Sequence, residues 1–262
     1  MYPLKSSNGD IVYQQHKKTM TTTGVPRQII ADGGTDIKAG VSRVCQDHPR
    51  TCFVYDIKHK AAAVLKRHLN SGTCWNEFVK RASSAAKQLQ QTDMAALAPP
   101  SQRSKSRYMN IDRLVKWAHE TLIFIDQQSV SPSLLYDQQI LHAKLGWLRD
   151  YRIQIEQWQE LIQVVESAVD FVRFHGFYRN CQHELAQEPS FDAQSPLAKR
   201  VREELLTFIK TESKKAKPQE RLLGSSEVIE SVFGKLKFLE KDQSKSGFTV
   251  LLLGLAASVS ET

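Results

Sequence analysis

Two short apolar runs near the start of the chain flank a segment with helical spacing. Residues 27–31 and 51–55 are rich in β-branched and aromatic side chains, and each run is followed by an aspartate. Between them, residues 36–47 carry Ile37, Val41 and Val44 at helical spacing. A helix that connects two strands is typical of a parallel sheet, so we expect two buried strands in an α/β core.

Most other apolar positions recur every three or four residues, which predicts amphipathic helices. The expected helices cover residues 11–20, 58–69 and 74–91, a segment that starts at Asn110 or Asp112, residues 131–176 with a bend near Gly146, and a segment that ends near residue 213. The clearest stripe, which we assign to the core, contains Trp158, Leu161, Ile162, Val165, Val169 and Val172. The chain is therefore expected to be α/β in class and predominantly α overall.

Candidate chemistry lies where the two strands end. In open α/β sheets ligands bind beyond the carboxyl ends of the strands, which is where Asp32 and its glycine-rich turn fall. A structural interpretation stays open, because Asp-Gly is a common turn and Asp36 can cap the following helix. After the second strand, Asp56 and His59 are expected to tie the strand end to the next helix by hydrogen bonds.

A second polar block spans residues 224–237. Its polar and charged positions include Ser225, Ser226, Glu227, Glu230, Lys235 and Lys237. A serine can cap a helix here, and acidic residues early with basic residues late are what the helix dipole favours. By itself, this block predicts a capped amphipathic helix.

The formal net charge of +8 and the pI near 9.3 suit a polyanionic partner. Two basic loops are candidate phosphate contacts or solvated linkers, and they contain Arg103, Lys105, Arg107, Lys214, Lys215 and Lys217. Four cysteines without a Cys-x-x-Cys pair indicate reduced thiols in the cytoplasm, and the histidines and cysteine of residues 175–183 match no standard zinc spacing. The longest uncharged apolar run, residues 248–259, is shorter than the ~20 residues that cross a bilayer.

Three phrases, IIADGGTDIKAGV, YDIKHK and SSEVIESVFGKLK, resemble the core of bacterial insertion-sequence transposases of the mutator-like and hAT-like kind. The resemblance implies a ribonuclease-H-like fold with an Asp-Asp-Glu triad. Asp32 matches its second carboxylate, Asp56 and His59 match a Cys-or-Asp-x-x-His motif, and Glu230 matches the glutamate, with Glu227 as the fallback. The catalytic and metal-binding residues implied are thus Asp32 and Glu230.

The resemblance also implies a domain plan and partners. Residues 1–70 would form a partial ribonuclease-H-like core, residues 71–222 an all-helical insertion, and residues 223–262 the part that carries the glutamate. Two magnesium ions would bind in the complete enzyme. The partners would be the element ends and the target DNA, held by basic residues that include Lys235 and Lys237, in a nucleoid-associated protein that can form a homo-oligomer.

The first carboxylate of the triad has no match in this chain. In the resembled fold it lies on the first of three antiparallel strands, and Asp10 is only 22 residues before Asp32. That is too few for two strands of about 5–6 residues and a helix of about 11. We therefore expect a chain truncated at its start and inactive by itself.

The alternative is a non-catalytic helical protein that binds nucleic acid or another partner. In such a protein these acidic residues would only cap helices and stabilise turns. Carboxyl groups of Asp32 and Glu230 within about 8 Å of each other would favour the transposase, since both must reach one metal pair. A wide separation would favour the alternative.

Overall fold

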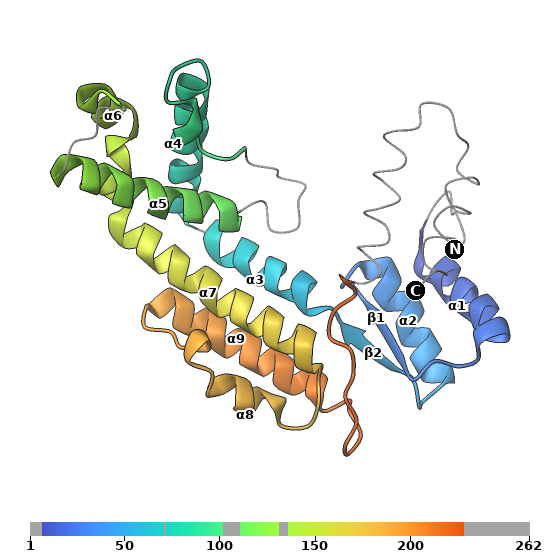
Figure 1. The fold of residues 1–262 in the computed structure, drawn as a ribbon. Helices are drawn as coiled ribbons and strands as arrows, with labels where there is room; N and C mark the ends of the chain where they lie inside the picture. Colours follow the sequence, from blue (N-terminus) through green and yellow to red (C-terminus); the bar gives the residue numbers. More distant parts are fainter. Residues whose placement is uncertain (1–6, 71, 102–110, 131–135, 228–262) are drawn as a thin grey trace, which may run out of the picture. The chain divides into compact units, whose positions relative to one another are not determined.

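The computed structural model describes residues 7–70, 72–101, 111–130 and 136–227. These residues are predominantly helical with a small parallel sheet of two strands, which confirms the expected mostly α composition (Figure 1). The chain divides into two compact units. Of the described residues, those up to Asp56 and those at 223–227 belong to one unit, and those between Ile57 and Leu222 belong to the other.

The first unit is built on the expected strand, helix and strand. Strand β1 (Gln28–Ala31) pairs in parallel with β2 (Cys52–Tyr55), and α2 (Thr35–Asp47) connects them. In the register, Gln28 lies opposite Cys52 and Ala31 opposite Tyr55. Both strands consequently end at the same edge of the sheet.

Helix α1 (Gly9–Thr23) packs against α2 (Figure 1). It starts where the side chain of Asn8 accepts a hydrogen bond from the amide of Ile11 at 2.8 Å, which satisfies one of the amides left open at a helix start. The small core of this unit joins both helices to one face of the sheet. It consists of Ile29, Val41 and Val44, with Val12, Tyr13, Met20, Ile37, Cys45 and Phe53 packed around them.

The expectation that both strands are buried is wrong for most of their residues. In each strand a single side chain is buried, Ile29 in β1 and Val54 in β2, and the others are half-buried. The physical reason is the size of the sheet: within the described residues each strand has a hydrogen-bonded neighbour on one side alone.

The second unit is helical. Its elements are α3 (Ile57–Asn70), α4 (Thr73–Leu89), η1 (Ala95–Leu97), α5 (Ile111–Val130), α6 (Gln138–Leu145), η2 (Gly146–Tyr151), α7 (Arg152–His175), α8 (Cys181–Ala186), η3 (Pro189–Phe191) and α9 (Pro196–Ser213). Helix α7 is central and packs against α3, α5 and α9 (Figure 1). Within the described ranges, no helix has both the length and the apolar character that crossing a bilayer needs.

The stripe predicted on α7 lies in the core of this unit. Five of its six members are buried, and Ile162 is half-buried and lines a pocket together with Val165 and Val169. The predicted bend at Gly146 is a six-residue 3-10 segment, η2, and the short helix α8 was not expected. Helix α3, placed with the core in the 1–70 prediction, belongs to the helical unit.

Candidate functional site

The carboxyl edge of the two-stranded sheet brings Asp32 and Asp56 to the ends of neighbouring strands. Ala31 and Tyr55 lie opposite each other in the register, and the amide of Asp56 donates to the carbonyl of Ala31 at 3.1 Å. The sequence-predicted edge is thus present, with two carboxylates following paired strands.

Asp32 is half-buried and closes the turn that follows β1. Its Oδ1 accepts a hydrogen bond from the amide of Gly34 at 3.1 Å. Its other carboxylate oxygen has no hydrogen bond within the described residues, which leaves one oxygen for a ligand. The capping role considered for Asp36 is wrong, because Gly34 occupies the cap position of α2 and Asp36 lies in the first turn.

Asp56 is fully buried, and its hydrogen-bond partner comes from a distant part of the sequence. Its Oδ2 accepts hydrogen bonds from both the amide and the hydroxyl of Ser226, each at 2.6 Å. From the sequence, Ser225 and Ser226 are both candidate helix caps, and Asp56 is expected to pair with His59. His59 is half-buried in the first turn of α3, and that pairing stays a prediction. The Oδ2 of Asp56 is therefore committed to a structural contact.

The phenol of Tyr55 is influenced by the negative charges of both aspartates. Burial raises the pKa of its phenol above the ordinary value, and the charges of Asp32 and then Asp56 raise it further. The ring also lies against the turn, since a Cβ on Gly33 would come within 3.0 Å of the Tyr55 hydroxyl. Tyr55 therefore stays protonated at neutral pH and presents an O–H donor at this edge.

The segment after Leu222 returns to the same sheet. The side chain of Gln28 donates to the carbonyl of Leu223 at 2.5 Å and accepts from its amide at 3.0 Å. At the end of the described residues, the amide of Glu227 donates to the hydroxyl of Ser225 at 3.3 Å. The hydroxyl of Ser226 is bonded to Asp56, and the capped helix predicted for this block lies outside the described residues and stays a prediction.

Several predicted residues lie outside the described ranges. They are Glu230, Lys235 and Lys237 in the last block and Arg103, Lys105 and Arg107 in the first basic loop. The separation of Asp32 from Glu230 therefore stays a prediction. Among the residues that the structure describes, no group of three or more histidine, cysteine, aspartate or glutamate side chains is arranged to hold a metal ion.

The second basic loop follows α9, and its lysines differ in their surroundings. The ammonium of Lys215 lies 2.7 Å from both carboxylate oxygens of Glu212, so its charge is compensated. Lys217 is exposed, and its amide donates to Glu220 at 2.7 Å. Lys214 lines a pocket together with Arg179 and Lys210. The local sequence does not indicate this grouping, because Arg179 lies between α7 and α8, whereas Lys210 and Lys214 lie at the end of α9.

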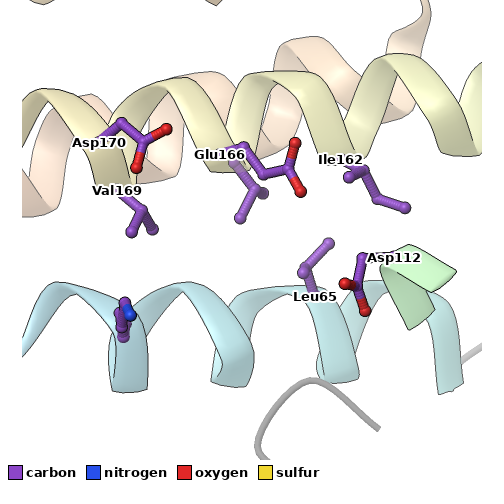
Figure 2. Close-up of a pocket in the computed structure, with 8 residues that line it drawn as sticks. Leu65, Asp112, Ile162, Glu166, Val169 and Asp170 are labelled. Carbon is purple, nitrogen blue, oxygen red and sulfur yellow. The ribbon is translucent and has the colours of Figure 1, made fainter. Parts of the chain in front are cut away.

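A separate pocket of about 170 Å³ lies between α3, α5 and α7 and was also missed by sequence reasoning. Figure 2 shows Glu166 and Asp170 on α7, Asp112 on α5 and Leu65 on α3 around it. Partial burial raises the pKa of Glu166, and the charges of Asp112 and Asp170 add to that rise, while Lys116 opposes it. An acidic pocket repels phosphate, so it does not suit a DNA backbone.

Comparisons of the chain with models of protein families, with curated proteins and with solved structures found no match.

Proposed function

We propose that this protein is a DNA-handling protein of the DDE transposase type. The observation that carries the proposal is the path of the chain. It leaves the strand pair after Asp56, forms a helical unit from Ile57 to Leu222, and returns at Leu223 to the same strand pair. A helical unit inserted between the second and third blocks of a split catalytic core is the arrangement that the resemblance implies.

The residues of the sheet edge support this assignment unequally. Asp32 is half-buried and keeps one carboxylate oxygen without a hydrogen bond within the described residues, as a metal ligand needs. The Oδ2 of Asp56 serves as an anchor for Ser226. Glu230 follows the anchor residue Ser226 by four positions in the sequence, and we propose it as the second ligand.

Bound magnesium would supply the charge that stabilises the attacking and leaving oxygens of a displacement at phosphorus. The described residues contribute Asp32 to such a site, and Glu230 completes the pair that this chain offers. The protein's own part is to bind and orient DNA, for which its net charge of +8 provides long-range attraction.

A matched pair of variants tests the proposal. Binding of a labelled DNA duplex is measured by fluorescence anisotropy with magnesium and with a chelator, at about 50 mM and about 200 mM salt. Asp32→Asn removes the proposed ligand, and Asp36→Asn makes the same change of charge four residues later. We expect magnesium to strengthen binding several-fold for the wild type and for Asp36→Asn, and not for Asp32→Asn.

Two results would overturn the proposal. One is a failure to bind duplex DNA at the lower salt concentration. The other is an equal response to magnesium in the wild type and both variants, which would mean that magnesium acts by general screening alone.

A second candidate function is a non-catalytic binding protein. The specific observation in its favour is that both aspartates make structural hydrogen bonds, Asp32 to Gly34 and Asp56 to Ser226. This candidate expects DNA binding without any effect of magnesium that depends on Asp32. The same measurement therefore separates the two functions.

A further inference from the structure

A pocket of about 350 Å³ lies where the end of α9 meets the start of α8. Its lining is polar and basic, and it consists of Arg179, Asn180, Gln182, Lys210, Ser213 and Lys214. Three of these six residues are cations, and none is a carboxylate. Helices α8 and α9 pack against each other in the helical unit, so both walls belong to one compact body (Figure 1).

The three cations are not neutralised within the described part of the chain. Lys210 and Lys214 are exposed and make no ion pair there. Arg179 donates from Nε to the carbonyl of Ala216 at 3.3 Å, which anchors the side chain while its two terminal nitrogens stay available. Three like charges around one pocket repel each other, and a bound anion would remove that repulsion.

The neighbouring carboxylates are already occupied. Glu212 lies 2.7 Å from the ammonium of Lys215, and Glu184 accepts a hydrogen bond from the hydroxyl of Tyr178 at 2.5 Å. Neither of these carboxylates lines the pocket. The positive charges of Arg179, Lys210 and Lys214 are therefore not compensated by these carboxylates and can attract an anionic ligand from solution.

The pocket also contains a polar group that the protein leaves without a partner. Gln182 is 8% exposed, and its Oε1 is buried without a hydrogen bond within the described residues. Because no internal bond fixes its carboxamide, a half-turn about the last side-chain bond presents the amino group as a donor. Next to it Asn180 holds the left-handed backbone conformation, with φ 66°, that turns the chain from Arg179 into α8.

We propose that this pocket binds a phosphate group. Arginine and lysine form charge-assisted hydrogen bonds to phosphate oxygens, and carboxamide N–H groups add neutral ones. A volume of about 350 Å³ has room for a phosphate together with part of the sugar that carries it. The phosphate comes either from the DNA backbone, in which case the site rests on the proposed function, or from a small phosphate compound.

Titration with inorganic phosphate tests the pocket directly. Amide shifts of residues 179–182 and 210–214 are followed by NMR in the full-length protein, with sodium chloride at matched ionic strength as the reference. We expect saturable shifts with phosphate alone, lost in Arg179→Gln and Lys210→Gln. Arg200→Gln, an exposed cation on α9 outside the pocket, is the control and keeps them.

All substituted positions are exposed, so thermal melting checks that each variant stays folded. Equal shifts with chloride and phosphate overturn the proposal, since they show a response to ionic strength alone. Phosphate binding that survives in both Arg179→Gln and Lys210→Gln overturns it as well, because the cations would then have no part in it.

Binding of a DNA duplex at several salt concentrations then identifies the source of the phosphate. If the pocket holds a backbone phosphate, Lys210→Gln lowers the slope of log affinity against log salt by about 0.9, and Arg200→Gln leaves it unchanged. An unchanged slope with intact phosphate binding assigns the pocket to a small phosphate compound. Phosphate binding without any DNA binding leaves the pocket in place and overturns the proposed function alone.

Discussion

At the scale of single residues, Glu204 shows how a charge becomes part of the helical unit. Its carboxylate on α9 contacts the side chains of Lys60, Arg67 and His68 on α3. The Nζ of Lys60 lies 2.8 Å from Oε1, and the Nε2 of His68 lies 3.3 Å from Oε2. Burial would raise its pKa, but the hydrogen bonds from Arg67 and Lys60 lower the pKa of Glu204 to about 2. The cluster therefore joins two helices that lie far apart in the sequence.

This lowered pKa gives a dependence of stability on pH. A carboxylate whose pKa is lower in the folded protein stabilises it above the ordinary value of 4.5, and the stabilisation is lost as the pH falls toward about 2. We expect Glu204→Gln to cost about 1–2 kcal/mol at neutral pH, after allowing for solvent screening, and to flatten the loss of stability below pH 4.5.

Urea denaturation of the wild type and the variant at a series of pH values measures this effect. Glu203→Gln is the matched control, because Glu203 is 71% exposed and pairs with Arg202 at the surface. An equal loss of stability in the two variants at neutral pH would show that the cluster around Glu204 contributes nothing specific.

At the scale of elements, a glycine on α2, Gly40, allows α1 and α2 to pack closely against each other. A Cβ on Gly40 would lie 2.6 Å from the side chain of Val12 and 2.8 Å from the carbonyl oxygen of Gly9. The second of these atoms belongs to the backbone, so an added methyl group requires the helices to separate. The small core around Ile29 and Val41 depends on this close approach.

Gly40→Ala is therefore expected to destabilise the protein by about 1–3 kcal/mol, because overpacking outweighs the gain in helix propensity. Gly146→Ala is the comparison. Gly146 has helical backbone angles, and its nearest neighbour to an added Cβ, the ring of His142, is at 3.7 Å. We expect that variant to be neutral or slightly more stable. The denaturation midpoints of the two variants are compared with that of the wild type. A Gly40→Ala protein as stable as the wild type would contradict the close contact.

At the scale of the whole molecule, the chain closes over a long distance. Asp56 and Ser226 are 170 residues apart in sequence, and their hydrogen bonds join the ends of the segment that forms the helical unit. Gln28 and Leu223 make a second contact of the same kind at 3.0 Å. The return of the chain thus depends on a few polar contacts with the strand pair.

Ser226→Ala removes the hydroxyl bond to a fully buried carboxylate and leaves the amide bond in place. We expect a loss of about 1.5–3 kcal/mol, the range for hydrogen bonds to charged groups. Ser42→Ala on α2 serves as the control, since Ser42 is half-buried and makes no side-chain hydrogen bond within the described residues. Chemical denaturation compares the two, and equal stabilities would show that the hydroxyl bond has no net value.

Most of the elements could be predicted from the sequence, although the short helix α8 could not. The β-branched and aromatic runs located the strand pair, and the helical spacing of apolar positions located the connecting helix and the core stripe of α7. It also placed Asp32 and Asp56 at strand ends, since that follows from the strand boundaries alone.

Which of these residues meet depends on how the elements pack in three dimensions. The contact of Asp56 with Ser226 rather than a local cap, the grouping of Arg179 with Lys210 and Lys214, and the acidic pocket beside α7 each join residues from separate elements. A local pattern carries no information about such pairs, because their distance depends on how helices pack and where the chain returns. For the same reason two aspartates that follow equivalent strands differ in role, one half-buried in a turn and the other fully buried against a serine 170 residues away.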